Sequence, residues 1–151
     1  MRVNNNNASL TFTVQDGTWF EYPNPKNSSF ANSAVIVSAR GSSAITLNVQ
    51  GTTFKNIVND SVNSGGDSTS TGTSSVTFSS NTVTVDSALN QEEISEARAG
   101  GVDFDSYGSS ALNVVATGNM FDRASGGGVF SIGANGTSTL RARVESNTAS
   151  N

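Results

Sequence analysis

One alternating stretch of the sequence recurs along the whole chain. Between Ala44 and Phe54, apolar residues stand at relative positions 0, 2, 4 and 9 of a template. Alternation over the first three positions predicts a strand with one buried face, and the Gly, Asn, Asp and Thr residues before position 9 predict a turn. The five copies are Leu10, Phe12, Val14 and Trp19; Ile45, Leu47, Val49 and Phe54; Val76, Phe78, Ser80 and Val85; Leu112, Val114, Ala116 and Phe121; Leu140, Ala142, Val144 and Ala149. Copies spaced by 35, 31, 36 and 28 residues are typical of a solenoid.

A second recurrent strand is expected about ten residues before the template strand. Its apolar pairs are Val35 and Val37, Val102 and Phe104, and Phe130 and Ile132. Gly-Gly pairs at 65–66, 100–101 and 127–128 predict tight corners that need positive φ. Helix formers occur together only at Asn90–Arg98, where one short helix is expected.

These patterns predict an all-β fold, a right-handed parallel β-helix of about four coils plus partial terminal coils. Residues 1–151 would form a single domain, as a segment of a longer repeat protein. Three strands per coil would stack in parallel, with apolar ladders Leu10–Ile45–Val76–Leu112–Leu140 and Phe12–Leu47–Phe78–Val114–Ala142 inside. The residues expected to be buried are Leu47, Val49, Phe54, Phe78, Val114 and Phe121, with Thr46, Asn48 and Ser79 outside. A β-sandwich or barrel of unrelated strands is the alternative.

Composition excludes several kinds of site. The chain has no Cys and no His, so thiolate chemistry, disulfides and imidazole bases or ligands are absent. Its net charge of −4, with eight scattered basic residues, argues against nucleic-acid binding. No apolar run is long enough for a membrane span, and Met1–Asn4 is too polar for a signal peptide.

Outward positions of the template strand carry Thr, Asn, Ser and Gln, and only the last copy adds charge, at Arg141, Arg143 and Glu145. That face therefore lacks the stacked acids and bases of a polysaccharide-cleaving groove. Trp19, Phe20 and Tyr22 could form a sugar-stacking platform, but Trp19 occupies position 9 of the template and is expected in the core.

Three carboxylates form the one candidate site. Asp103 and Asp105 flank Phe104 and should point outward together. Asp103 precedes the first residue of the fourth template copy by nine residues. The residue nine positions before the third copy is Asp67, which would therefore stand in the same column as Asp103, one coil away. Such a cluster could serve glycoside hydrolysis, bind a hard cation through oxygen, or only solvate the surface. With no His or Cys nearby, Ca²⁺ is the predicted ion for a weak structural site at Asp67, Asp103 and Asp105.

Short motifs add a resemblance. Phe78–Asn81 has the form Phe-x-x-Asn, residues 100–102 and 127–129 read Gly-Gly-Val, and Val144–Ser150 is similar to the segment before such a step. The chain thereby resembles passenger segments of polymorphic outer-membrane proteins and related autotransporters. The resemblance implies a secreted, surface-displayed β-helical stalk, often within a much longer polypeptide.

The leading functional hypothesis is a non-enzymatic, extracellular or cell-surface structural or adhesin module that binds carbohydrate or a cell surface through its loops. One alternative is a polysaccharide-active β-helix enzyme of the pectate lyase or polygalacturonase kind, or a fragment of one. Another is a filament subunit that associates through uncapped ends, since residues 1–9 and 145–151 show no cap.

Overall fold

The computed structural model describes residues 1–21, 33–57, 59–86, 101–124 and 129–150. These residues form fifteen strands in three parallel five-stranded sheets, with no helix among them. Sheet A contains β1 (Arg2–Asn6), β4 (Val35–Arg40), β7 (Val62–Gly65), β10 (Val102–Ser106) and β13 (Phe130–Ala134). Sheet B contains β2 (Ser9–Val14), β5 (Ala44–Gln50), β8 (Thr73–Ser79), β11 (Ala111–Thr117) and β14 (Thr139–Glu145). Sheet C contains β3 (Trp19–Glu21), β6 (Thr53–Lys55), β9 (Thr82–Thr84), β12 (Met120–Asp122) and β15 (Thr148–Ser150).

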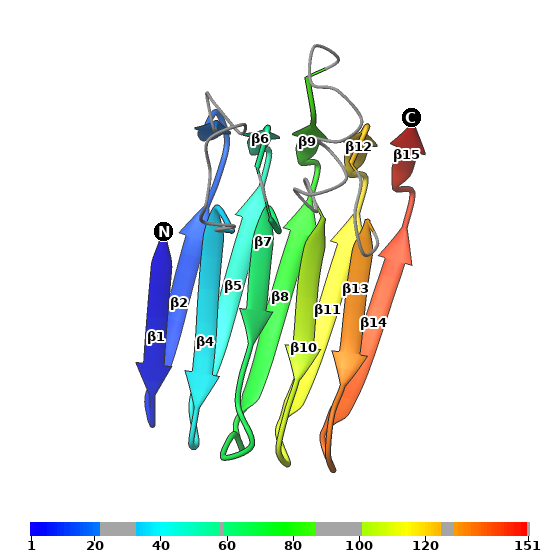
Figure 1. Ribbon diagram of the computed structural model, residues 1–151. Helices are drawn as coiled ribbons and strands as arrows, with labels where there is room; N and C mark the ends of the chain where they lie inside the picture. The colour runs from blue at the N-terminus through cyan, green and yellow to red at the C-terminus, as the bar shows by residue number, and fades with distance from the viewer. Residues whose placement is uncertain (22–32, 58, 87–100, 125–128, 151) are drawn as a thin grey trace.

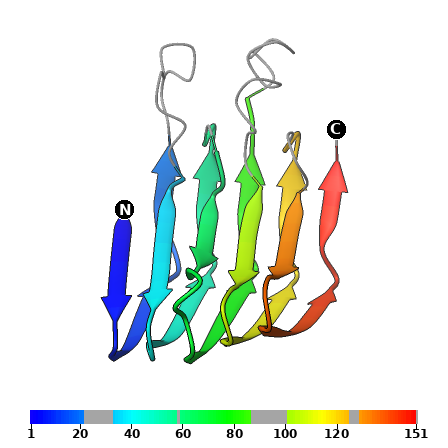
Figure 2. The same ribbon diagram turned by 60° about the horizontal axis from the view of Figure 1, so that its bottom comes forward.

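Consecutive strands visit the three sheets in turn, so that β1–β3 form the first rung and β13–β15 the fifth. Figure 1 shows the strands of sheet A side by side in chain order, with those of sheet B behind them. The rotated view keeps this order, and the two chain ends lie at opposite sides of the stack (Figure 2). The predicted all-β stack of parallel strands is confirmed. The helix expected at Asn90–Arg98 lies outside the described residues.

Corners between sheets B and C are built on a ladder of asparagines. Four of these corners contain two residues each: Gly51–Thr52, Ser80–Asn81, Gly118–Asn119 and Ser146–Asn147. The first residue of each corner has φ between 55° and 65°, a region that glycine tolerates best. Asn119 Oδ1 accepts hydrogen bonds from the backbone N and Nδ2 of Asn81, both at 3.0 Å, and Asn147 Oδ1 accepts the same pair from Asn119 at 3.0 and 2.7 Å. Side chains thus satisfy buried backbone groups that the sheets leave unpaired.

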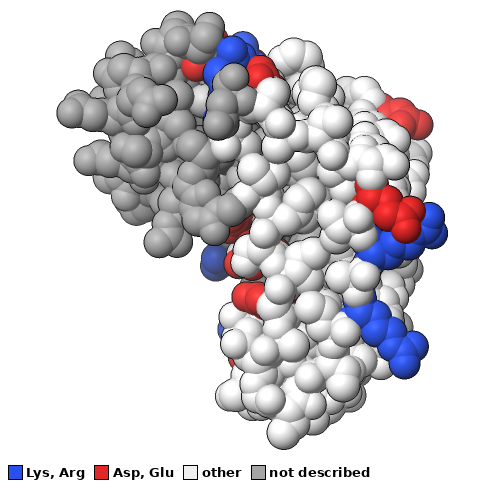
Figure 3. Space-filling model, turned by 90° about the vertical axis from the view of Figure 1, so that its right-hand side faces the viewer, with Lys and Arg blue, Asp and Glu red and all other residues white. Residues whose placement is uncertain are grey.

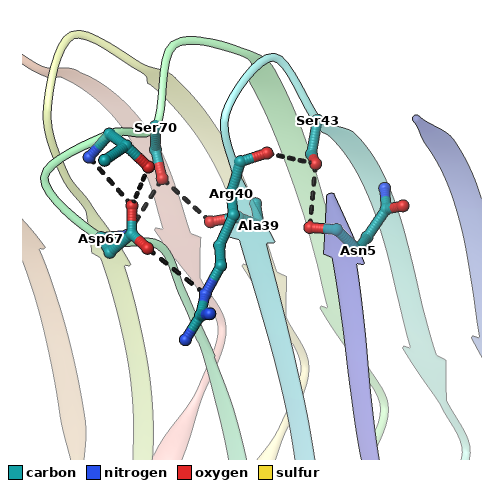
Figure 4. Close-up of polar contacts among 7 residues, drawn as sticks. Asn5, Ala39, Arg40, Ser43, Asp67 and Ser70 are labelled. Atoms are coloured by element: carbon teal, nitrogen blue, oxygen red, sulfur yellow. Dashed lines mark hydrogen bonds and ion pairs between the residues drawn. The ribbon is translucent and has the colours of Figure 1, made fainter. Parts of the chain in front are cut away.

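Corners between sheets A and B use serine hydroxyls in a comparable way. Ser43 Oγ donates to the carbonyl of Asn5 at 2.9 Å, and Ser70 Oγ donates to the carbonyl of Ala39 at 2.9 Å (Figure 4). Ser138 Oγ donates to the carbonyl of Ser106 at 3.0 Å. Each hydroxyl ties its own rung to the preceding one, so the Ser-rich composition serves packing at this edge.

Apolar side chains fill the space between the sheets. Phe78 lies at the centre, with ring centroids at 6.3 Å from Phe54, 6.1 Å from Phe104 and 6.3 Å from Phe121. All six residues predicted to be buried are buried: Leu47, Val49, Phe54, Phe78, Val114 and Phe121. Thr46, Asn48 and Ser79 lie on the outer face of sheet B, as predicted. Alternation therefore identified the inner face of this sheet correctly.

The third rung contradicts the predicted ladders. Val76 pairs with Leu47 and Val114, and Phe78 pairs with Val49 and Ala116, two residues away from the predicted register. Ser74 takes the inward position next to Leu112 instead. Its hydroxyl accepts the backbone N–H of Ile45 at 3.3 Å, so a polar residue is satisfied there. A two-residue shift preserves the alternation, which explains why burial was predicted correctly and register was not.

Trp19 was also placed wrongly. Its side chain is 59% exposed, and Phe20 occupies the core position that was assigned to it. Phe20 pairs with Phe54, and their rings stack with centroids 5.3 Å apart. The connection from β2 to β3 has four residues (15–18) where the later corners have two, so a fixed spacing of nine points at the wrong residue. In the third rung, Val83 takes the corresponding place beside Phe54, although Val85 is buried as well.

Uneven repeat spacing has its main source in the connections from sheet C to sheet A. These connections span residues 22–34, 56–61, 85–101 and 123–129. The corners from sheet B to sheet C are nearly constant in length. Chain-length variation is therefore concentrated along one edge of the stack.

Candidate functional site

The outer face of sheet A carries the candidate site, because three neighbouring strands present polar side chains there. Val102, Phe104 and Ser106 of β10 point inward and are buried, which turns Asp103 and Asp105 outward, as predicted. Asp103 lies between Asn63 of β7 and Ser131 of β13 in one column.

Asp103 is the most constrained of these groups. Its Oδ2 accepts a hydrogen bond from Nδ2 of Asn63 at 3.1 Å, and the same amide lies 3.3 Å from Oδ2 of Asp60. Its Oδ1 is buried and makes no hydrogen bond of acceptable geometry among the described residues, although the hydroxyl of Ser131 on the next strand is close enough to oppose the rise in its pKa. Burial raises the pKa of Asp103, and the charges of Asp105 and Asp60 raise it further. Asp103 therefore holds its proton to higher pH than an exposed aspartate.

The position of the Asp105 carboxylate is fixed by a hydrogen bond on one side and by a closely packed neighbouring strand on the other. The hydroxyl of Tyr107 donates to Oδ2 of Asp105 at 3.0 Å, and this bond to the carboxylate raises the pKa of Tyr107. On the next strand, a Cβ at Gly133 would stand 2.3 Å from Oδ1 of Asp105. Glycine at 133 thus leaves room for the carboxylate, and any larger residue would displace it.

Asp67 does not join this cluster. It lies in the turn after β7, where Oδ2 is 3.3 Å from Nε of Arg40 and Oδ1 accepts the backbone N–H of Thr69 at 2.9 Å (Figure 4). Hydrogen bonds from Thr69, followed by the charge of Arg40, lower the pKa of Asp67. The residue beside Asp103 is Asn63, so the predicted carboxylate column is wrong. The wrong placement of Asp67 comes from the connection 66–72. This connection has seven residues, whereas the prediction assumed the same distance between the two strands in every coil.

No group of three or more His, Cys, Asp or Glu side chains in the described ranges is placed to hold a metal ion. The Ca²⁺ site predicted at Asp67, Asp103 and Asp105 therefore lacks its assumed ligand geometry. The O–H of Tyr107 and the side-chain amide of Asn63 already donate within the cluster, so the arrangement offers a ligand mainly acceptors, the remaining lone pairs of Asp105, which can bind the hydroxyl groups of a hydroxyl-rich ligand.

Three members of the cluster were missed by sequence reasoning: Asp60, Asn63 and Tyr107. Asp60 and Asn63 belong to a filler segment without periodic signal. Tyr107 stands two residues after Asp105, the one usable hint. Beside it lies a shallow depression of about 450 Å³, lined by Ser68, Tyr107, Gly108, Ser109, Asn135, Gly136 and Thr137. Tyr22 of the proposed stacking platform lies outside the described residues, and Phe20 is in the core.

Searches with family models, curated proteins and solved structures found no match to this chain. Within the part of the chain that the structure describes, no helix is long and apolar enough to cross a membrane.

The raised pKa of Asp103 leads to a stability prediction. Between its ordinary value of 3.8 and the higher value in the folded protein, the folded state binds more protons than the unfolded state. The free energy of unfolding should therefore fall as pH rises through that window. Asp103→Asn should remove this dependence and increase the free energy of unfolding at neutral pH. Urea unfolding from acidic to neutral pH measures both effects.

Asp67→Asn is the matched control, because the pKa of Asp67 is shifted the other way. The ionised Asp67 carboxylate adds to the free energy of unfolding at pH values above its ordinary pKa. This contribution is lost as the pH falls through the lower pKa of the folded protein. The two variants should change the pH profile with opposite sign. A profile of Asp103→Asn that parallels the unsubstituted protein would contradict the assignment.

Proposed function

We propose that this chain is a non-enzymatic structural or adhesin module that is secreted or displayed at a cell surface. In this proposal the sheets wind as a right-handed parallel β-helix of about four coils plus partial terminal coils. The stack acts as a spacer, and carbohydrate or a cell surface is bound by the segments that connect the sheets. The extracellular location follows the resemblance to autotransporter passengers and is part of the proposal.

The observation that supports this function most directly is the placement of length variation. The connections at 22–34 and 85–101 are long and lie between sheets C and A, whereas the asparagine corners stay at two residues. A scaffold with constant corners and variable connections at one edge suits recognition by loops, because changes there leave the stack intact.

Replacing residues 88–99 with a short Gly/Ser linker tests this division. We expect the unfolding temperature to change by no more than about 4 °C, since the length of a connection alters closure entropy only slowly. Binding to immobilised acidic and neutral polysaccharides is measured before and after the replacement. Lost binding with an unchanged unfolding temperature supports the proposal, whereas collapse of the fold would assign the segment to the scaffold.

A polysaccharide-active enzyme is the second candidate, favoured by one observation. Asp103, with its raised pKa, stands two residues from Asp105 on the same outward face, and acid catalysis of glycoside cleavage uses a carboxyl group whose pKa is raised. The outward positions of sheet B carry no charge in its first four strands, which does not favour an acidic-sugar groove there. Release of reducing ends or unsaturated products from uronic-acid polymers, abolished by Asp103→Asn, would establish the enzyme and overturn the module.

A further inference from the structure

The two ends of the stack each expose an unpaired edge. Within the described residues, β1, β2 and β3 pair only with the second rung, and β13, β14 and β15 pair only with the fourth. Of the β14 side chains that continue the inner ladders, Leu140 is half-buried, whereas Ala142 and Val144 are exposed, Val144 at 46%. Figure 3 faces this end and shows charged side chains at the margins, with uncharged atoms across the middle.

If the first rung of a second copy were placed next to the fifth rung of the first copy, strand register would determine which residues meet. The inner ladders of sheet B run through Leu10 to Leu140, through Phe12 to Ala142, and through Val14 to Val144. The inner ladder of sheet C runs through Phe20 to Ala149. Continuing each ladder into a second copy of this chain places Leu140 against Leu10 and Ala142 against Phe12, and both Leu10 and Phe12 are only half-buried in the single chain.

Side-chain sizes in this register are complementary. Ala142 would meet Phe12, and Ala149 would meet Phe20, so the two rings of the first rung in sheets B and C face small residues of the fifth rung. In sheet A, Ile132 would meet Val3 and Phe130 would meet Met1. The same combination occurs inside the molecule, where Phe78 pairs with Ala116. An interior keeps its packing density when large and small residues alternate across facing positions.

Charges on the outer faces are compatible with the same register. Arg2 would stand beside Ser131 in the column that also contains Asp103, which places a cation near the acidic cluster. Arg141 and Arg143 would stand beside Thr11 and Thr13. No like charges oppose each other in these columns.

We propose that copies of this chain stack head to tail, with β1–β3 of one copy paired in parallel with β13–β15 of the next. The contact joins two different surfaces and does not close on itself, so it produces open filaments that grow by about 24 Å per copy. The stacking proposal names a second copy of this chain as a partner of the proposed structural module. It does not depend on whether the connections between sheets bind a ligand. Loss of stacking therefore leaves the loop-replacement test unaffected.

Sedimentation velocity over a concentration series tests the association with the 151-residue chain. Ala142→Lys places a charge on the inner ladder at an already exposed position and should weaken association by at least about tenfold. Val115→Lys adds the same charge on the outer face of β11 and should leave association unchanged. A strictly monomeric unsubstituted protein, or equal association of both variants, would overturn the proposal.

Cysteine cross-linking tests the register, because the chain has no cysteine of its own. A double variant with Thr11→Cys and Arg141→Cys should give ladders of covalent oligomers with a short bis-maleimide. A double variant with Thr11→Cys and Ser75→Cys should give no such ladder, since Ser75 of the same column lies three rungs, about 14 Å, from Thr11 of the next copy. Dimers from Arg141→Cys alone as the main product would indicate an end-to-end contact of two fifth rungs and would overturn head-to-tail stacking.

Discussion

Phe78→Ala is expected to lower the free energy of unfolding by about 3–5 kcal/mol. Phe78 is fully buried, and its ring contacts Phe54, Phe104, Phe121 and Phe130 with centroids between 6.1 and 6.5 Å. The substitution removes a large apolar surface and the edge contacts of the ring at once, and the sheets on both sides hold the cavity open. Urea unfolding followed by far-UV circular dichroism measures the loss.

Val115→Ala is the control for this experiment. Val115 is 37% exposed on the outer face of β11, so its truncation should change the free energy of unfolding by no more than about 0.5 kcal/mol. Comparable losses in the two variants would show that the inner and outer faces of the stack had been confused.

Asn119→Ala is expected to cost about 2–5 kcal/mol, although it removes no apolar surface. The side chain is 1% exposed, accepts two hydrogen bonds from Asn81, and donates to the carbonyl of Phe78 at 2.9 Å. Alanine leaves the backbone N–H of Asn81 buried without its acceptor, at about 1–3 kcal/mol, and removes a hydrogen bond to the carbonyl of Phe78, at about 0.5–1.5 kcal/mol. Thermal and urea unfolding both report the effect.

Two further asparagines calibrate that result. Asn147 lies at the open end of the ladder and is less buried, so Asn147→Ala should cost less than Asn119→Ala. Asn113 stands on the outer face of β11, and Asn113→Ala should be nearly neutral. An equal effect at all three positions would contradict a structural role for the ladder.

Alternation in the sequence predicted the inner and outer faces because it depends only on the strand period. It placed Leu47 inside, Thr46 outside, and Asp103 and Asp105 together on one face. Register depends on corner length and hydrogen bonding, which apolar spacing does not report. Trp19 was therefore misplaced by the longer connection before it.

The candidate site was predictable only where one strand carries it. Asp105 and Asp103 share β10, so their common direction follows from the sequence. Asn63, which also bonds Asp60, reaches Asp103 from a different rung, and that contact depends on register across the stack. Asp67 was misassigned for the same reason, because the length of the connection between β7 and β8 decides which residue stands in the column.

The asparagine corner has a consequence for how such a molecule can change length over generations. Thr52, Asn81, Asn119 and Asn147 stand at equivalent points of successive rungs. Met120 is now preceded by an asparagine. A deletion that joins Asn81 directly to Met120 would keep an asparagine in that place. Recombination between repeats at this point can add or remove a whole rung, in steps of about 4.8 Å, without disturbing the rungs on either side.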